Sequence, residues 1–344
     1  MNLLAGAVRA AERASLPDAA MLAIVGWLAR HNARRLARIS PDEEARFVAD
    51  TANDPIGLGD AGGAIPAHDG LPHEFFGLVL GPQYNLSCCR YPGATTSLAE
   101  AEVLALDETI EHAALRDGQR ILELGAGWGC LALRLAEQYP RSRIVCVATG
   151  QAQRRYIEAR ARERILPNLT VAPYAINAFE APERFDRVVS IELFGQIANW
   201  RALLSRVSDW LEPDGRLFLH VFAHRSRSYR FDASDPNDWL AQHFFASQWI
   251  PAIDLPHRFA DVFSVEQEWR WPGVDYRRTA LDWLANFDSN RARIDELMGE
   301  AYGADAALWS WRWRTFFLTA AGFFGYAGGA EWGVGRYRLA LSRP

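Results

Sequence analysis

The sequence lacks most of the features that would assign it directly to a broad functional class. Its 344 residues carry a net charge of -5 with an isoelectric point near 5.9, so no overall positive charge favours nucleic acid. The longest apolar run near the N-terminus, residues 21–29, is too short to span a bilayer and lacks a convincing cleavage site after it. We therefore expect a soluble, cytoplasmic protein with no nucleic-acid partner and at most peripheral membrane contact.

Cysteine is also scarce. The four cysteines, Cys88, Cys89, Cys130 and Cys146, show no zinc-ligand spacing, and the last two lie in apolar patterns that indicate core positions. This usage fits a reducing cytoplasm. We expect no metal site.

One stretch, Arg-Ile-Leu-Glu-Leu-Gly-Ala-Gly-Trp-Gly-Cys at residues 120–130, predicts a short strand, a glycine loop and the start of a helix. Glycines let the backbone approach a ligand that side chains would exclude, which indicates a nucleotide site. The G-x-G-x-G spacing differs from the dinucleotide motif, and the next predicted strand, residues 143–149, ends without the acid that holds a ribose. Glu123 stands where class I S-adenosylmethionine methyltransferases keep an acidic residue. A glycine turn in another α/β protein is the alternative.

Strands and helices alternate through the middle of the chain. This pattern predicts an α/β fold with a mostly parallel, Rossmann-like sheet, helices on both faces and a ligand at the carboxyl ends of the strands. The predicted strands are residues 120–124, 143–149, 169–174, 185–192 and 216–223, and the predicted helices are residues 98–114, 131–139, 152–164 and 200–211.

Two regions flank this alternation. Residues 1–65 predict an N-terminal helical cap, whose basic positions are either a solvated face or a contact with anionic lipid. Those positions are Arg30, Arg34 and Arg38, beside a predicted packing stripe of Met21, Ile24, Val25 and Leu28. Residues 67–91 predict a lid over the cofactor.

The C-terminal part is rich in aromatic residues. Residues 224–261 interrupt the alternation and suit a substrate-binding insertion. Beyond them we predict a strand at residues 262–271, one helix at 276–299, an aromatic helix at 308–325 and a late antiparallel strand at 332–341. Trp313 and Phe317 share a face of the aromatic helix, and either core packing or a pocket wall explains this spacing.

Taken together, these segments resemble the cyclopropane fatty acid synthase superfamily, in particular its coclaurine N-methyltransferase-like branch, from about residue 65 to the C-terminus. The resemblance rests on residues 68–81, Ser87-Cys88, the glycine loop at 123–129, Ile191-Glu192-x-Phe194, residues 220–224, Asp238-Trp239 and residues 313–317. It implies a class I S-adenosylmethionine methyltransferase domain at residues 66–344, with S-adenosyl-L-methionine as cofactor.

The resemblance also implies roles for individual residues. The cofactor contacts that it implies are Tyr84, Ser87, Glu123, Gly125, Ala126, Gly127, Ala148, Thr149, Gln153, Ile176, Asn177 and Glu192. The substrate pocket that it implies contains Cys88, Phe222, Trp313, Phe317 and Tyr326.

The sequence departs from the family pattern just after the fourth predicted strand. Relatives usually carry Glu-His there, whereas this chain reads Glu192-Leu193-Phe194-Gly195-Gln196. The cyclopropane synthases also have a bicarbonate site. Its counterparts here would be Cys88, Gly195, His220, Phe222 and Tyr276. Because Gly195 stands in place of a glutamate, the carboxylate of that site is lost. A lesser departure is Ala175, where many relatives have an acid that reaches the adenine.

Methyl transfer is an in-line displacement that needs a positioned nucleophile and, for a protonated one, a base. We expect the catalytic residues among His220, His224, Tyr276, Glu192 and Gln196. N-methylation of a small amine is the leading hypothesis. C-methylation or cyclopropanation of an unsaturated fatty acyl chain is the alternative, and a non-catalytic cofactor-binding regulator is a third. A homodimer is left open.

Overall fold

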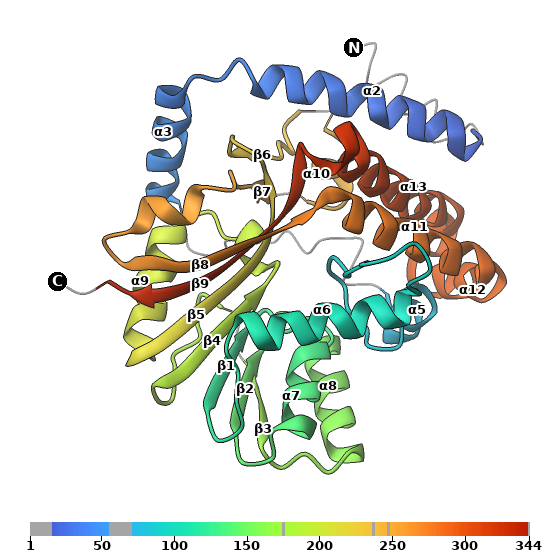
Figure 1. Cartoon of the computed structure of the whole chain (residues 1–344). Helices are drawn as coiled ribbons and strands as arrows, with labels where there is room; N and C mark the ends of the chain where they lie inside the picture. The colour runs from blue at the N-terminus through green and yellow to red at the C-terminus, as the bar shows by residue number, and fades with distance from the viewer. Residues whose placement is uncertain (1–15, 55–70, 174–175, 236–237, 246–247, 343–344) are drawn as a thin grey trace.

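The computed structural model describes residues 16–54, 71–173, 176–235, 238–245 and 248–342. Its centre is a seven-stranded sheet with the order β3-β2-β1-β4-β5-β9-β8 (Figure 1). The strands are β1 (Arg120–Leu124), β2 (Arg143–Val147), β3 (Leu169–Ala172), β4 (Phe185–Ile191), β5 (Leu211–His224), β8 (Phe263–Pro272) and β9 (Trp332–Leu341). The first five strands pair in parallel, and β9 pairs antiparallel with both β5 and β8. The predicted fold class is confirmed.

Helices cover both faces of the sheet because successive strand residues point to opposite sides. In β1, Ile121 packs with α6 (Leu98–His112), α7 (Cys130–Gln138) and α8 (Gln151–Glu163), whereas Leu122 packs on the side of α9 (Trp200–Trp210). Figure 1 shows α6, α7 and α8 grouped on one side of the sheet and α9 on the other. Helices therefore cover both faces of the parallel part of the sheet, and a ligand is expected at the carboxyl ends of these strands.

A second layer of helices lies beyond the edge of the sheet (Figure 1). Its members are α2 (Asp18–Leu36), α5 (His73–Val79), α10 (Trp239–His243), α11 (Gly273–Ser289), α12 (Arg291–Tyr302) and α13 (Ala306–Gly325). The helix α3 (Pro41–Asp50) lies apart from them, on the side of the sheet that α9 covers. The short elements are η1 (Thr51–Asn53), η2 (Leu193–Gln196), η3 (Leu255–Phe259), η4 (Gly303–Asp305), η5 (Tyr326–Gly329), β6 (Tyr229–Arg230) and β7 (Trp249–Ile250).

Two predicted boundaries are wrong. The single helix predicted at 276–299 is two helices, and Asn290 separates them because its side-chain amide donates to the carbonyls of Leu78 and Asn286. The fifth strand begins at Leu211 instead of 216, because Leu211 already pairs with Phe185 of β4. Residues 212–215 form an irregularity before Arg216 pairs with Arg187.

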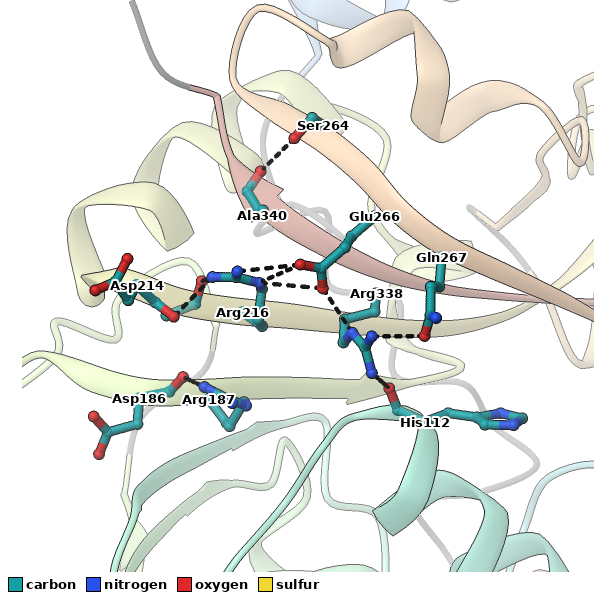
Figure 2. A network of polar contacts seen from close by, with 11 residues as sticks. His112, Asp186, Arg187, Asp214, Arg216, Ser264, Glu266, Gln267, Arg338 and Ala340 are labelled. Carbon is teal, nitrogen blue, oxygen red and sulfur yellow. Dashed lines mark hydrogen bonds and ion pairs between the residues drawn. The ribbon is translucent and has the colours of Figure 1, made fainter.

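The late strands are held to the sheet by a polar network on its exposed surface (Figure 2). Glu266 of β8 accepts from Arg216 of β5 at 3.1 Å and from Arg338 of β9 at 2.7 Å, and Arg338 also donates to Gln267 at 2.6 Å and to the carbonyl of His112 at 3.2 Å. Single exposed ion pairs contribute little, but one carboxylate shared by two arginines across three strands fixes their register.

The N-terminal helices pack on the rest of the chain. Met21 and Val25 of α2 are buried, and Val25 lies so close to α13 that a Cβ at Gly322 would meet it at 2.4 Å. The carboxylate of Glu44 in α3 is buried and accepts from Ser228 and Arg258, at 3.1 and 3.2 Å. The predicted packing stripe is wrong at Ile24, which is 44% exposed. No described helix is long and apolar enough to cross a membrane.

Candidate functional site

The glycine loop lies between β1 and α7, at the carboxyl ends of the parallel strands. All three glycines have positive φ, but the space around them differs. A Cβ at Gly125 would lie 2.8 Å from Leu193, and one at Gly129 would lie 2.6 Å from Ile157, whereas nothing lies within 4 Å of a Cβ built at Gly127. Gly125 and Gly129 are therefore required by the fold, and Gly127 is the position where the loop faces open space. Such a bare backbone suits a ligand that approaches closely.

The loop after β2 is the second part of this rim. Arg154 donates to the carbonyls of Ala148 and Thr149 at 2.9 and 2.7 Å, and Gln153 accepts from the Gly150 amide at 3.1 Å. Ala148 is buried, Thr149 is exposed and no acidic side chain takes part. Arg154 therefore fixes the backbone of Ala148 and Thr149, two of the predicted cofactor contacts. The side chain of Gln153 is engaged with the N-terminus of α8.

Glu123 lies beneath the glycine loop and not at its surface. It is 2% exposed, it packs on the face of the sheet that α7 covers, and its Oε2 has no partner among the described residues. Burial raises the pKa of its carboxyl to about 8, and the amide of Ala132 opposes this shift. At neutral pH the group is thus largely protonated.

Ile176, another predicted cofactor contact, is buried in the sheet core, and Asn177 beside it is exposed. The guanidinium of Arg206 donates to the carbonyls of both residues, at 3.3 and 3.1 Å. Ala126 is buried, and its amide donates to the carbonyl of Val147 at 2.9 Å. Ala126 follows the end of β1 beside Gly127, and Ile176 and Asn177 both follow the end of β3.

The segment of residues 81–87 crosses this rim and is fixed by a buried carboxylate. Glu102 of α6 is fully buried and accepts the amides of Gln83 and Asn85 at 2.8 and 3.1 Å. Tyr84 between them has a φ of 58° and its ring lies 5.2 Å from that of Tyr156. A left-handed tyrosine costs about 1 kcal/mol or more, so the clamp by Glu102 imposes this path. The path carries Ser87 into the site.

Ser87, Glu192 and His220 form a compact polar cluster. The hydroxyl of Ser87 donates to Glu192 Oε1 at 3.2 Å, and His220 Nε2 lies 3.2 Å from Ser87 Oγ and 3.4 Å from Glu192 Oε1. Glu192 Oε2 accepts the amide of Phe222 at 3.1 Å. Glu192 has a φ of 60°, and strain of this kind is typical of functional sites. The three residues come from the covering segment, the end of β4 and β5.

Burial lowers the pKa of His220, while the hydrogen bond to Glu192 opposes this shift. The imidazole is therefore neutral near pH 7. An ionised Glu192 only accepts, so the tautomer with its proton on Nε2 satisfies both groups. The basic lone pair is then on Nδ1, which is buried without a partner among the described residues. This cluster can both attract a cation and take up a proton.

Two other predicted members lie beside the cluster. Burial raises the pKa of Tyr276 well above its ordinary value, and the charge of Glu192 adds to the effect. Tyr276 therefore keeps its proton and cannot serve as the base, although it can donate a hydrogen bond. Burial likewise raises the pKa of the Cys88 thiol, which excludes a thiolate nucleophile.

The departure at residues 195 and 196 has a structural counterpart. A Cβ at Gly195 would lie 3.1 Å from Cζ of Phe222, and Gly195 is buried in η2. Phe222 thus occupies the space beside residue 195 into which a longer side chain would extend. Gln196 is partly buried in the same helix.

His224 lies outside the cluster, although it follows His220 on the same strand. Its Nε2 is 3.0 Å from Glu331, and its Nδ1 accepts the amide of Arg227 at 2.9 Å. Both ring nitrogens are therefore engaged in holding the start of the insertion. We no longer count His224 among the catalytic candidates.

Trp313 and Phe317, predicted to line the substrate pocket, lie in the aromatic core between α5, α11 and α13. Both are 1% exposed, and the ring of Trp313 lies 4.9 Å from that of Phe75. Tyr326 is partly buried, and its ring lies 6.0 Å from that of Trp332. Of the predicted pocket residues, Cys88 and Phe222 are the two that lie at the cluster.

Two buried residues behind His220 were not predicted. The rings of Trp271 and His220 are nearly perpendicular, with centroids 5.2 Å apart, and the guanidinium of Arg336 lies over the Trp271 ring, 4.0 Å from its centroid. Arg336 is fully buried and donates to Thr109 at 2.8 Å and to Glu108 at 3.3 Å. These partners come from α6, β8 and β9, so local sequence gives no signal for them. Glu102 has one signal, because it is a charge on the apolar face of α6.

Comparison with known proteins shows the family to which this chain belongs. The model of the mycolic acid cyclopropane synthetase family matches residues 61–312. The chain belongs to this family. Its (S)-coclaurine N-methyltransferase relatives from Thalictrum flavum subsp. glaucum and Papaver somniferum are each 32% identical, over 76% of this chain and over 74% and 76% of the respective relatives. The cyclopropane-fatty-acyl-phospholipid synthase of Escherichia coli (strain K12) is 25% identical, over 64% of this chain and 55% of that enzyme.

Solved structures agree with this placement. The structure of coclaurine N-methyltransferase bound to N-methylheliamine and SAH has a TM-score of 0.89 and 28% identity, and the match covers 94% of this chain and 96% of that one. The cyclopropane synthase MmaA2 from Mycobacterium tuberculosis matches with a TM-score of 0.68 and 21% identity, over 84% and 100% of the chains, and supports the fold alone. The protein is a class I S-adenosylmethionine-dependent methyltransferase.

The rim fits this cofactor. Gly127 offers uncovered backbone at the carboxyl end of β1, the Ala148–Thr149 backbone lies at the end of β2, and Ser87 and Glu192 carry oxygens at the end of β4. The carboxylate of Glu192 suits the positive charge of a sulfonium. Among the described residues, no group of His, Cys, Asp and Glu side chains is arranged to hold a metal ion.

Proposed function

We propose that this enzyme transfers a methyl group from S-adenosylmethionine to the nitrogen of a small amine. The observation that carries the proposal is the cluster of Ser87, Glu192 and His220, in which a carboxylate and a neutral imidazole lie 3.4 Å apart at the end of β4. Support also comes from the coclaurine N-methyltransferase relatives, which match more of this chain, at higher identity, than the cyclopropane synthase of Escherichia coli does.

S-adenosylmethionine supplies an electrophilic methyl group on a positively charged sulfur. Glu192 draws a cationic amine to the rim, since opposite charges attract strongly where water is largely excluded. A protonated amine must lose a proton before its lone pair can attack. The pair of Glu192 and His220 takes up that proton, and Glu192 is its more accessible member, because its side chain is 13% exposed and that of His220 is 3% exposed.

The new carbon–nitrogen bond then forms as the carbon–sulfur bond breaks, and the methylated amine leaves with the charge that the sulfur loses. Ser87 keeps Glu192 in place through its hydroxyl. Tyr276 can donate a hydrogen bond to the amine or to a ring oxygen of the acceptor. Glu192 and His220, which lie at positions that match the family pattern, therefore supply the proton transfer without the Glu-His pair that relatives usually carry at residues 195 and 196.

The proposal is tested by incubating the purified enzyme with methyl-labelled cofactor and a panel of small secondary and primary amines, with product detection by mass spectrometry. We expect a singly methylated amine, and we expect His220→Gln to abolish most of the transfer while cofactor binding is kept. Tight cofactor binding without transfer to any amine or lipid would support the non-catalytic hypothesis instead.

Transfer to an unsaturated fatty acyl chain is the second candidate. It is favoured by the match to the cyclopropane synthetase family and by Cys88, His220 and Tyr276, which lie around Glu192. The same labelled cofactor with phospholipid vesicles that contain unsaturated chains distinguishes the two candidates, because an acyl product gains one carbon and the amines stay unmodified.

A further inference from the structure

The outward face of α2 combines exposed apolar and cationic side chains. Five large apolar side chains are exposed among the described residues. Two of them lie on α2, where Ile24 is 44% exposed and Trp27 56%, and a third, Leu16, is 36% exposed and lies just before the helix begins. Single exposed apolar residues are ordinary, but a group on one face indicates a binding surface.

The geometry of the helix places these residues together. At 3.6 residues per turn, Ile24 and Trp27 are neighbours, and Arg30 and Arg34 follow Trp27 at spacings of three and seven residues. Met21, Val25 and Ala29 lie on the opposite face and are buried against the body of the protein. Figure 1 shows α2 as a long helix along the outer edge of the molecule, beside α13. The apolar half of its outer face is N-terminal, and the cationic half is C-terminal.

The cations on this face are not neutralised. Arg30, Arg34 and Arg38 are exposed, and within the described ranges no hydrogen bond or ion pair of their side chains is present. Asp18 is the only acidic residue of α2, and it pairs with Arg314 of α13. Although the chain has a net charge of -5, α2 and the turn that follows it therefore carry a local excess of positive charge.

The same features favour one occupant over others. A second copy would bring the arginines of two helices together, and three apolar side chains fall well short of the roughly 800 Å² per partner of a stable dimer. Nucleic acid would pair with the arginines but would leave Leu16 and Ile24 in water. An anionic membrane surface satisfies both halves, because arginines meet lipid phosphates while tryptophan and aliphatic side chains enter the headgroup region.

We propose that the outer face of α2, formed by Ile24, Trp27, Arg30 and Arg34, together with Leu16 just before the helix and Arg38 just after it, docks the enzyme on anionic membrane surfaces. This contact is peripheral and does not depend on which acceptor is methylated. It places the enzyme beside the bilayer, where apolar amines and acyl chains both concentrate.

The test is cosedimentation of the full-length protein with vesicles of phosphatidylcholine alone or of equal parts phosphatidylcholine and phosphatidylglycerol. We expect binding to the anionic vesicles only, with affinity that falls as salt rises. Each arginine near such a surface strengthens binding about fivefold, so replacing Arg30, Arg34 and Arg38 by Gln should weaken binding about a hundredfold. Trp27→Ser combined with Ile24→Ser should weaken it as well.

A matched control removes the same charge elsewhere. Arg155, Arg162 and Arg270 are exposed on other elements, and their joint replacement by Gln should leave vesicle binding close to that of the parent. Thermal melting and methyl transfer should be unchanged in all of these variants. The proposal is overturned if the parent does not bind anionic vesicles or if both triple variants lose binding equally. It is also overturned if light scattering shows a dimer that Trp27→Ser dissociates.

Discussion

Replacing Glu192 by Gln removes the negative charge at the centre of the proposed catalytic cluster while keeping the shape of the side chain. Glu192 accepts from Ser87 at 3.2 Å, from the amide of Phe222 at 3.1 Å and lies 3.4 Å from His220 Nε2. A glutamine has one acceptor oxygen, so its amide group faces a donor and at least one of these contacts is lost. Removing general-base help costs about 10² to 10⁴ in rate, which is about 2.7–5.4 kcal/mol of activation free energy.

The pH dependence of the rate gives a second, independent signature. Burial lowers the pKa of His220 and Glu192 opposes that shift, so Glu192→Gln should lower the pKa of His220 further. The low-pH limb of the kcat profile should therefore move to lower pH while the plateau falls. The assay is transfer of labelled methyl to one amine with both enzymes, so that the pKa of the amine is common to both profiles.

The matched control is Glu331→Gln, which alters the other buried carboxylate–imidazole pair, at His224. It should lower the melting temperature but leave the low-pH limb in place. If Glu192→Gln keeps the kcat and the pH profile of the parent, or if both variants change the profile alike, the assignment of Glu192 and His220 is wrong.

Three further predictions concern the cofactor rim and the core. Gly127→Ala should raise the KM for the cofactor with a stability loss of about 1–2 kcal/mol from its positive φ, whereas Gly129→Ala should be markedly less stable because its Cβ would meet Ile157; cofactor titration and thermal melting distinguish them, and equal effects would contradict the account. Glu102→Gln should raise the KM for the cofactor. Burial raises the pKa of Glu102 to about 7, above its ordinary value of 4.5, so its contribution to stability is present below pH 4.5 and is lost as pH rises through 7, by about 3 kcal/mol. Unfolding of the cofactor-free parent and Glu102→Gln across this pH range tests the sign, since the variant should lack this loss. Trp313→Ala should cost about 3–5 kcal/mol in chemical unfolding; a small stability loss with a large change in substrate KM would support a pocket wall instead.

The sheet and the glycine loop could be predicted because their signals are local. The strand β1, the positive-φ glycines and the alternation of strands and helices lie within one stretch of chain, and β9 coincides with the predicted residues 332–341. The position of β9 between β5 and β8 could not be predicted. The helices α11 to α13 separate β9 from β8 in the sequence, and β5 comes earlier still, so both pairings are tertiary contacts.

The site was predictable in its residue types but not in its partners. His220 and His224 lie on the same face of β5, about 13 Å apart along the strand, and sequence alone does not separate them. The two histidines are distinguished by partners that are distant in sequence, because His220 contacts Glu192 and His224 contacts Glu331. The clamp by Glu102 was missed for the same reason, because it acts on the backbone of a segment 17 to 19 residues away.

The central claim is methyl transfer to an amine nitrogen, and one measurement tests it most directly. The purified enzyme is incubated with methyl-labelled S-adenosylmethionine and an equal mixture of small amines and unsaturated phospholipid, and the products are identified by mass spectrometry. The account predicts label on an amine nitrogen, and its loss in His220→Gln. Label found only in a lipid chain that has gained one carbon would contradict it.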